Sequence, residues 1–366
     1  MPSWYKPRLS ESIAEQPIES MIAPSAISPA IDAAHNVVFY PTFGRRTVAG
    51  WNVAVHGAVF RDGVDDFRRR FFLGVLRRVL KARREELDSE IFRDNIVGFL
   101  QREQPGRRMA IELGSRLHLL AEPSKRNGHF RSVIYLPDDE VAALQQSGVI
   151  ERDWVSFRGA LSDAQSHAFS GTAQLIRPAG LSIISDIDDT LKHSGVSQRK
   201  SLLTNTFLRK FEGVAGMASV FQRWAASGAA FHYVSSSPWQ LYPPLKRLLD
   251  MEGYPPGSFH LKTVRFRDPS VLRLFVARRR PKLREILSII QAFPERRFVL
   301  VGDSCEKDPE IYGAMARKFP QQIARIYIRN IAAKPLSPLR AEKAFRRVPG
   351  EAWRVFRDAR ELEAMG

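Results

Sequence analysis

Hydrophobic residues are spaced differently in the two halves of the chain. Between residues 37 and 177, short apolar runs alternate with polar positions and end at glycines, as in WNVAVHGAVF over residues 51–60. Successive side chains of a strand point to opposite faces, so this spacing predicts half-buried strands. We expect an antiparallel β-rich, sandwich-like domain over residues 37–177. Residues 1–36 show weak periodicity and are expected to form an N-terminal arm.

A helical pattern interrupts this domain over residues 67–101. Apolar residues such as Phe71, Val75 and Val79 recur every three to four positions, and the other face of residues 67–84 carries eight Lys or Arg. Two interpretations stay open. The segment is a helical hairpin that packs on the sheet with a solvated basic face, or it is a basic amphipathic helix that lies on an anionic membrane.

Beyond Ala179-Gly180, apolar strand-like runs alternate with helical patterns. Alternation of this kind predicts a parallel sheet with helices on both faces, which we place at residues 178–335. The charged residues 336–366 are expected to form a C-terminal helical tail. The strand candidates are LSIIS (181–185), AFHYVSS (230–236), SFHLKTV (258–264), RFVLVGDS (297–304) and IARIYIR (323–329).

Two carboxylates, Asp186 and Asp188, directly follow the first of these strands. Ligands of parallel sheets bind at the carboxyl ends of the strands. Two carboxylates that reach one pocket repel each other unless a cation or a proton lies between them, and oxygen ligands of this kind suit Mg²⁺. One carboxylate could attack phosphorus while the other acts as acid and base. The alternative is an Asp-rich turn or helix cap.

Polar groups also follow two later strands. Ser235 and Ser236 are expected at a strand-to-helix turn, where hydroxyl and N–H groups can hold phosphate oxygens, although a plain helix cap is the alternative. Gly302 permits a tight turn before Asp303, a further candidate metal ligand, and Asp308 is a carboxylate behind it.

Lys282 lies at the start of a predicted helix. A lysine there could balance the carboxylates and bind phosphate. The alternative is a solvated charge, because Arg278, Arg279 and Arg280 are close by in the sequence.

Taken in this order, the four motifs resemble the haloacid dehalogenase superfamily of phosphatases. The strings SDIDDTLKHSGV, TFLRKFEGVAGMA, FHYVSSSPWQLYP and FVLVGDSCEKDPEIY narrow the resemblance, over about residues 175–335, to the catalytic domain of the actin-patch-protein family of Mg²⁺-dependent phosphatidate phosphatases, which is related to the lipin catalytic domain. Cys305 stands where glycine is expected. The matching residues are Asp186, Asp188 and Thr190, then Ser235, then Lys282, and finally Gly302, Asp303 and Asp308.

The resemblance implies a Rossmann-like α/β catalytic domain and a role for each matched residue. It implies that Asp186 is the nucleophile that forms an aspartyl-phosphate, and that Asp188 is the general acid and then the base. Mg²⁺ would be held by Asp186, the backbone carbonyl of Asp188, and Asp303. The phosphoryl oxygens would be bound by Ser235, with Ser236 beside it, and by Lys282. Thr190 and Asp308 would support these groups, and Asp308 would orient Lys282 or a metal-bound water.

The net charge of the chain favours anionic partners. Lys and Arg total 56 against 39 acidic residues, for a net charge of +17. Such a surface attracts phosphorylated substrates, anionic lipids or nucleic acid. Residues 265–284 carry eight Lys or Arg against one acid and would concentrate an anionic substrate or membrane. The chain has no basic–aromatic platform of the kind that single strands need, so no nucleic-acid partner is expected.

Composition excludes several classes of protein. The single cysteine excludes an intramolecular disulfide framework and a Cys-rich zinc site. No stretch approaches the roughly 20 apolar residues of a membrane span, and the first residues lack the apolar core of a secretory signal. We therefore expect a cytoplasmic protein that associates peripherally with membranes. Trp239 and Tyr242 are expected either at the rim of the site, near a membrane interface, or in the core.

The leading hypothesis is Mg²⁺-dependent hydrolysis of phosphatidate to diacylglycerol. Only about 45 residues separate the first motif from Ser235, which leaves little room for a large lid and suits a bulky lipid headgroup. One alternative is a phosphatase that acts on phosphoproteins, nucleic-acid ends or other soluble phosphomonoesters. The other is a non-catalytic module that binds anionic lipid. The presence of both Asp186 and Asp188 favours an enzyme.

Overall fold

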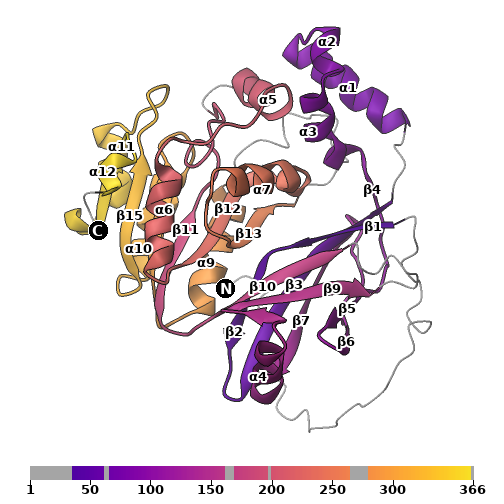
Figure 1. Ribbon diagram of the computed structural model, residues 1–366. Helices are drawn as coiled ribbons and strands as arrows, with labels where there is room; N and C mark the ends of the chain where they lie inside the picture. Colours follow the sequence, from indigo (N-terminus) through magenta and orange to yellow (C-terminus); the bar gives the residue numbers. More distant parts are fainter. Residues whose placement is uncertain (1–34, 62–65, 161–168, 197–198, 264–278, 364–366) are drawn as a thin grey trace.

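The computed structural model describes residues 35–61, 66–160, 169–196, 199–263 and 279–363. A β-rich domain and an α/β domain lie side by side (Figure 1). Residues 1–34 of the expected N-terminal arm and residues 265–278 of the basic stretch 265–284 lie outside the described residues, while the last two residues of the arm begin strand β1. No helix among the described residues is long and apolar enough to cross a membrane.

The β-rich domain is built on one ten-stranded sheet. The strand order is β1-β3-β2-β10-β9-β5-β6, with β4 and β7 paired to β3, and β8 paired to β9. The strands are β1 (His35–Tyr40), β2 (Thr42–Arg46), β3 (Gly50–Arg61), β4 (Arg102–Glu103), β5 (Ala110–Leu113), β6 (Arg116–Leu119), β7 (His129–Pro137), β8 (Ile150–Glu151), β9 (Trp154–Ala160) and β10 (Ser170–Ile176). A short helix, α4 (Asp138–Gln146), follows β7.

The expectation of an antiparallel sandwich is wrong in one respect. Strands β2 and β10 run parallel, so the sheet is mixed. Alternation along each strand predicts which face is buried, but it carries no information about which strand pairs with which. Val53 and Val55 of β3 share one core with Ile111 of β5 and Phe157 of β9, so strands from distant parts of one sheet enclose the core together.

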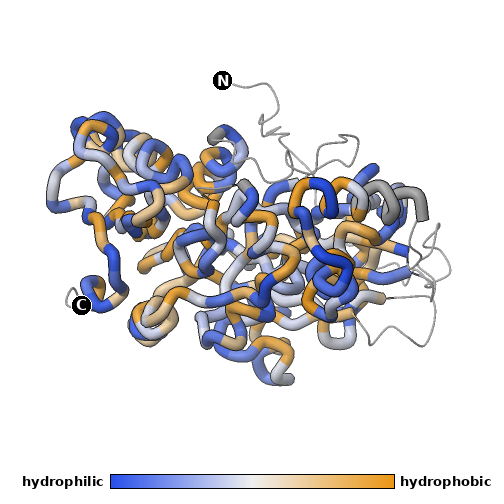
Figure 2. Tube along the Cα trace, turned by 90° about the horizontal axis from the view of Figure 1, so that it is seen from above, coloured by the Kyte–Doolittle hydropathy of each residue, from blue (hydrophilic) through white to orange (hydrophobic). Residues whose placement is uncertain are grey.

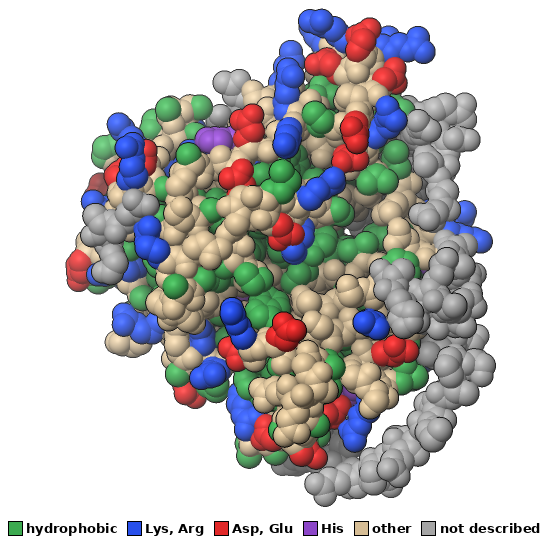
Figure 3. All heavy atoms as spheres, in the orientation of Figure 1, with side chains coloured by type: hydrophobic (Ala, Val, Ile, Leu, Met, Phe, Trp, Pro, Cys, Tyr) green, Lys and Arg blue, Asp and Glu red, His purple; other side chains and the backbone are tan. Residues whose placement is uncertain are grey.

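The helical insertion consists of α1 (Asp66–Leu80), α2 (Arg84–Leu87) and α3 (Glu90–Leu100). The hydroxyl of Ser89 caps α3 by accepting a hydrogen bond from the N–H of Phe92 at 3.2 Å. Leu76, Leu80 and Ile96 are buried in a hydrophobic cluster that continues into the α/β domain. One apolar face of the insertion is thus packed in the fold, whereas Ile91 and Val97 of α3 are exposed. Basic and acidic side chains mix at the outer end of the insertion, at the top of Figure 3.

The α/β domain contains a six-stranded, fully parallel sheet with the order β13-β12-β11-β14-β15-β16. Its strands are β11 (Gly180–Ser185), β12 (Ala230–Pro238), β13 (Ser258–Lys262), β14 (Arg296–Asp303), β15 (Ile323–Arg329) and β16 (Trp353–Phe356). Its helices are α5 (Arg199–Phe207), α6 (Met217–Ala226), α7 (Tyr242–Met251), α9 (Arg279–Ala292), α10 (Asp308–Lys318), α11 (Pro338–Phe345) and α12 (Arg360–Glu363), with 3-10 turns η3 (Trp239–Leu241) and η4 (Gly350–Ala352).

Helices cover both faces of this sheet, as the alternating pattern predicts. Ile183 of β11 packs in the cluster that contains Phe221 of α6, and its neighbour Ile184 packs in the cluster that contains Ile289 of α9. Consecutive strand residues therefore reach opposite layers. Figure 2 shows hydrophobic and hydrophilic stretches interspersed along the whole trace.

The C-terminal segment is not the helical tail expected over residues 336–366. Between α11 and α12, strand β16 pairs in parallel with β15 and extends the parallel sheet. Phe356 of this strand is buried. In a four-residue strand among charged residues, the hydrophobic pattern is too short to distinguish a strand from a helix by sequence.

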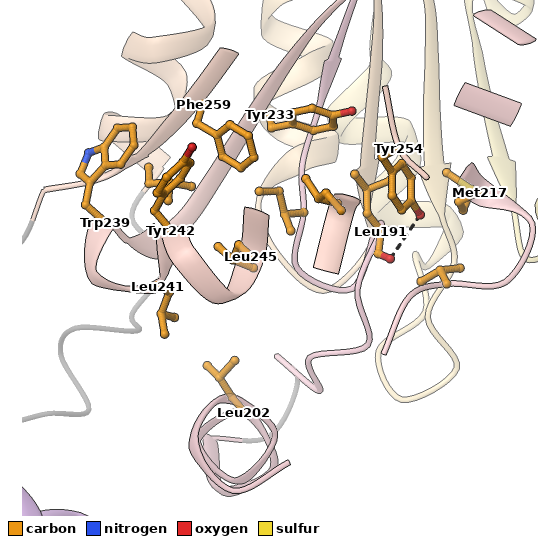
Figure 4. Close-up of a cluster of buried hydrophobic side chains, with 14 of the residues drawn as sticks. Leu191, Leu202, Met217, Tyr233, Trp239, Leu241, Tyr242, Leu245, Tyr254 and Phe259 are labelled. Atoms are coloured by element: carbon orange, nitrogen blue, oxygen red, sulfur yellow. Dashed lines mark hydrogen bonds between the residues drawn. The ribbon is translucent and has the colours of Figure 1, made fainter. Parts of the chain in front are cut away.

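The structure decides between the two interpretations of Trp239 and Tyr242. Both are buried, and Figure 4 shows them in one cluster of hydrophobic side chains with Phe259. Their rings lie against Tyr40 with centroid distances of 4.1 and 4.9 Å. His56 and His129 of the β-rich domain complete this cluster, with His56 Nε2 3.2 Å from His129 Nδ1. Trp239 and Tyr242 thus join the two domains, and the expectation that they line the rim of the site is wrong.

Burial lowers the pKa of both histidines at this interface. Burial, assisted by the charge of Arg131, lowers the pKa of His129 to about 4. Burial also lowers the pKa of His56 well below its usual value. A neutral imidazole in the folded state becomes protonated more readily on unfolding, so acid favours the unfolded chain.

We predict that His129 makes the protein less stable as the pH falls from about 6.5 toward 4. The unfolded chain takes up a proton there that the folded chain does not, at a cost of about 2 kcal/mol between pH 7.5 and 5. In urea titrations, His129→Gln should lose less stability between these two pH values than the wild type. The difference at pH 7.5, where the imidazole is neutral in both states, measures the packing loss alone. An unchanged pH dependence would contradict the prediction.

Candidate active site

Asp186 is the first polar residue after β11 and is fully buried. Its backbone N–H donates to the carbonyl of Val301 at 2.9 Å, which fixes the turn beside β14. Its Oδ2 accepts a hydrogen bond from the hydroxyl of Thr190 at 3.1 Å, and its Oδ1 lies 2.6 Å from Lys282 Nζ. The structure therefore brings Asp186, Thr190 and Lys282 together, as the motifs predict.

Asp189 organises the loop after this turn. Its φ angle is +58°, a conformation that aspartate tolerates better than most residues. Its carboxylate accepts hydrogen bonds from the backbone N–H groups of Ser194, Gly195 and Val196 at 2.7–2.9 Å. Arg329 Nη1 donates to its carbonyl at 2.8 Å. The loop is folded back by these bonds, so residues 192–194 return to the site.

Lys282 lies in the first turn of α9 and is buried among carboxylates. Its Nζ lies 2.6 Å from Asp186, 3.2 Å from Glu306 and 2.5 Å from Asp308. Burial alone would lower the pKa of Lys282, but the three carboxylates raise it well above its usual value. The ammonium is therefore charged, and it is a buried partner of the site rather than a solvated charge.

Asp303 ends β14 and faces the same group. Its Oδ1 accepts hydrogen bonds from the backbone N–H groups of Cys305 and Glu306. Its Oδ2 is buried and has no hydrogen-bond partner among the described residues. Gly302 is required beside it, because a Cβ at that position would lie 2.3 Å from Asp308 Oδ2.

These carboxylates fit a divalent cation. Asp186, Asp303 and Asp308 each offer an oxygen, and these oxygens lie within 4.8 Å of one another. Glu306 brings the group to four buried carboxylates, and Lys282 is the one cation among the described residues that forms ion pairs with members of this group. Burial, reinforced by the neighbouring carboxylates, raises the pKa of Asp186 and of Asp303 well above the usual range. A cluster of oxygen ligands with excess negative charge suits Mg²⁺.

Asp188 lies in a different environment. Its Oδ2 accepts hydrogen bonds from the hydroxyls of Ser235 and Ser237 at 2.8 and 2.7 Å, and its Oδ1 accepts one from Ser194 at 2.7 Å. Lys192 Nζ lies 3.1 Å from the same Oδ1. Burial would raise the pKa of Asp188, but Lys192 and the hydroxyls hold it below its usual range. The side chain is thus an ionised acceptor in this arrangement.

The serines do not lie in a strand-to-helix turn. Strand β12 continues to Pro238, and its pairing with β13 shifts between Val234 and Pro238. Ser235 and Ser236 lie in this irregular stretch, which turns their hydroxyls to different partners. The Ser236 hydroxyl donates to Glu306 at 3.1 Å. Both serines therefore border the carboxylate group around Lys282.

Four contributors to the site are absent from the sequence prediction. Glu306 lies between the two predicted carboxylates of GDSCEKD, so an acidic residue there was a usable signal. Lys192, Ser194 and Ser237 carry no comparable signal, because their positions depend on how the loop after Asp189 and the irregular end of β12 fold.

The C-terminal segment holds the loop that carries Asp303 and Glu306. Arg340 of α11 donates to the backbone carbonyls of Ser304 and Glu306 and pairs with Glu310 at 2.9 Å. Lys334 Nζ donates to the carbonyl of Cys305 at 2.7 Å. Cys305 contributes to the site through its backbone, which explains how cysteine can occupy a position where glycine is expected.

We predict that Mg²⁺ stabilises the protein through Asp303. An ion that binds only the folded state adds about 1.4 kcal/mol to the free energy of unfolding when its free concentration is tenfold above its dissociation constant. After chelation, MgCl₂ should raise the thermal midpoint of the wild type, and Asp303→Asn should lose most of this increment. Without metal, the variant should be at least as stable as the wild type, because it lacks one of the mutually repelling carboxylates.

Two controls accompany this measurement. NaCl at matched ionic strength separates metal binding from charge screening. Asp139→Asn makes the same chemical change on the exposed surface of α4 and should keep the full increment. An equal Mg²⁺ increment in Asp303→Asn and in the wild type would contradict the assignment.

Comparisons with known proteins find similarity in the α/β domain. The model of the family described as "Phosphatidate phosphatase APP1, catalytic domain" matches residues 181–330. Phosphatidate phosphatase APP1 of Saccharomyces cerevisiae is 37% identical over 161 residues, which are 43% of this chain and 27% of that protein. The uncharacterized protein C29B5.04c of Schizosaccharomyces pombe is 32% identical over 168 residues, 45% of this chain and 27% of that protein.

The chain thus spans about a quarter of the length of each yeast relative. A solved structure, the D,D-heptose 1.7-bisphosphate phosphatase from B. bronchiseptica complexed with magnesium and phosphate, covers 51% of this chain and 100% of that chain. Its sequence identity is 11% and its TM-score 0.24, too low to establish a common fold. The sequence matches fall on the α/β domain that carries Asp186, Lys282 and Asp303. This domain therefore resembles the catalytic domain of the APP1-type phosphatidate phosphatases, which confirms the family resemblance that its four motifs predict.

Proposed function

We propose that the protein is a Mg²⁺-dependent phosphomonoester hydrolase and that phosphatidate is its substrate. The observation that carries this proposal is the fully buried Asp186, held 2.6 Å from Lys282 inside a group of carboxylates, in a domain similar to the APP1 catalytic domain. A carboxylate that is fixed beside a buried cation has the position of a nucleophile whose product, an acyl phosphate, is stabilised by that cation.

In the first step, a carboxylate oxygen of Asp186 attacks phosphorus and the bond from phosphorus to the alcohol oxygen breaks. The products are an aspartyl-phosphate and the alcohol, which is diacylglycerol when the substrate is phosphatidate. The ammonium of Lys282 neutralises charge on the transferred phosphoryl group, and the hydroxyls of Ser235 and Ser236 bind its oxygens. Asp186, the Asp188 carbonyl and Asp303 would hold Mg²⁺, which would supply charge stabilisation at the same group.

Asp188 provides the proton for the leaving alcohol. In the structure it is held ionised by Lys192 and by three hydroxyls. When Ser235 turns its hydroxyl toward substrate, Asp188 loses one of these hydrogen bonds, and its affinity for a proton rises. Asp188 then takes up a proton from solvent and gives this proton to the alcohol, and its carboxylate later removes a proton from the water that hydrolyses the aspartyl-phosphate.

The substrate assignment rests on the similarity to phosphatidate phosphatase APP1 and on the net charge of +17, which favours an anionic surface. We place the protein in the cytoplasm, peripherally on anionic membranes, with no nucleic-acid partner. Soluble phosphomonoesters, phosphoproteins and non-catalytic lipid binding are the competing functions that the following experiment separates.

We predict that the purified chain releases phosphate from phosphatidate in mixed micelles only with Mg²⁺. Asp186→Asn should lower the rate by at least about a thousandfold, because the amide is a poor nucleophile. A soluble phosphomonoester and a phosphopeptide should be hydrolysed much more slowly. The matched control is Asp139→Asn, which makes the same change on the exposed surface and should keep full activity.

The other outcomes have clear meanings. Release from the soluble substrates alone would retain the chemistry and reject the lipid assignment. Activity that survives in Asp186→Asn would reject the nucleophile. No release from any substrate, together with retained binding to anionic vesicles, would favour the lipid-binding module.

A further inference from the structure

A groove leads away from the proposed phosphate site. It has a volume of about 820 Å³ and is lined at one end by Ser235, Ser236 and Lys282. It follows α9 past Arg284 to Lys318, the last residue of α10. A single transferred phosphoryl group occupies only a small part of a space of this size. The rest of the groove therefore has room for another part of the substrate or for a second molecule.

Both domains form the walls of this groove. Strand β13 is the edge strand of the parallel sheet, and the β-rich domain lies against it. The N–H of Phe259 on β13 donates to the carbonyl of Pro41 at 3.1 Å, and the rings of Phe43 and His260 are 6.1 Å apart. Through this contact the β-rich domain brings Arg131 of β7 into the wall of the groove.

The charge of the groove is positive beyond Lys282. Its one acidic residue among the described ones, Glu285, lies 3.6 Å from His260. Burial would raise the pKa of Glu285, but His260 and the nearby arginines lower it. The cations are Arg131, Lys262, Arg284 and Lys318. An excess of fixed positive charge in a concave site attracts anions and concentrates them there.

Arg131 is the cation that the β-rich domain adds to the groove, while Lys262, Arg284 and Lys318 come from the α/β domain. It occupies an outward position of β7, while its neighbours Phe130 and Ser132 point inward. Its side chain is exposed and forms no hydrogen bond or ion pair with another described residue. Its guanidinium can therefore offer paired donors to a phosphate.

We propose that this groove is a second anion-binding position, to which the β-rich domain contributes Arg131, and that it receives a phosphate group other than the one being transferred. The second phosphate belongs either to the same substrate molecule or to the headgroup of a neighbouring anionic lipid. The kinetic test of this inference rests on the proposed phosphatase function. It gives the β-rich domain a direct part in choosing the substrate.

The test compares Arg131→Gln and Arg131→Lys with the wild type in three assays. These use glycerol 3-phosphate, the bisphosphate fructose 1,6-bisphosphate, and phosphatidate in neutral micelles with and without added phosphatidylglycerol. Arg131→Gln should leave glycerol 3-phosphate unaffected. A fivefold to tenfold higher KM for the bisphosphate, with kcat unchanged, identifies a second phosphate on the same molecule. Loss of stimulation by phosphatidylglycerol identifies a neighbouring lipid. Arg131→Lys should retain part of either effect.

Arg108→Gln is the matched control, because Arg108 is an exposed arginine of the same domain that does not line the groove. If Arg131→Gln matches the wild type in all three assays, the inference is wrong.

Binding of pyrophosphate in metal-free buffer, measured by calorimetry, separates this inference from the enzyme assignment. If no substrate is turned over, Arg131→Gln should still weaken pyrophosphate binding about fivefold relative to the wild type and Arg108→Gln. Equal affinities in all three proteins would overturn the inference.

Discussion

The site depends on the ion pairs of one buried lysine. Lys282 is the ammonium that allows Asp186, Glu306 and Asp308 to lie together inside the protein. Removing one partner of such a buried group leaves unpaired charge at a cost of about 3–5 kcal/mol, so the arrangement is held together as a unit. The same arrangement leaves more negative than positive charge, and Asp303 Oδ2 has no partner among the described residues. That imbalance is the reason why this group of carboxylates fits a divalent cation.

The fold delivers these groups from distant parts of the chain to one edge of a sheet. Asp186 follows β11 and Asp303 ends its neighbour β14, while α9 presents Lys282 from its first turn. The C-terminal segment then fixes the loop after Asp303 through Arg340 and Lys334. The region that matches the catalytic family ends at residue 330, so this support lies just beyond the matched region.

The sequence predicts the residues whose positions depend on strand ends and misses those that depend on loops. Asp186, Asp303 and Lys282 are predictable because each lies directly at the end of an apolar strand or at the start of a helix. Lys192 and Ser194 reach Asp188 only because Asp189 folds the intervening loop. Likewise, the spacing of hydrophobic residues predicts a β-rich domain and a parallel sheet. The parallel pairing of β2 with β10 and the addition of β16 depend on contacts between distant segments, which this spacing does not encode. The sequence cannot tell whether Trp239 and Tyr242 lie at a rim or in a core, because their burial depends on the packing of the β-rich domain against them.

The central claim, that Asp186 takes up the phosphoryl group, is tested most directly by trapping the acyl phosphate. The enzyme is mixed with Mg²⁺ and substrate, quenched, and reduced with borohydride, which converts an aspartyl-phosphate into homoserine. Mass spectrometry of the peptide that contains residues 181–190 should then show homoserine at position 186, and Asp186→Asn should show none. An actively hydrolysing enzyme that carries the modification at Asp188 or Glu306, or that carries none at all, would contradict the account.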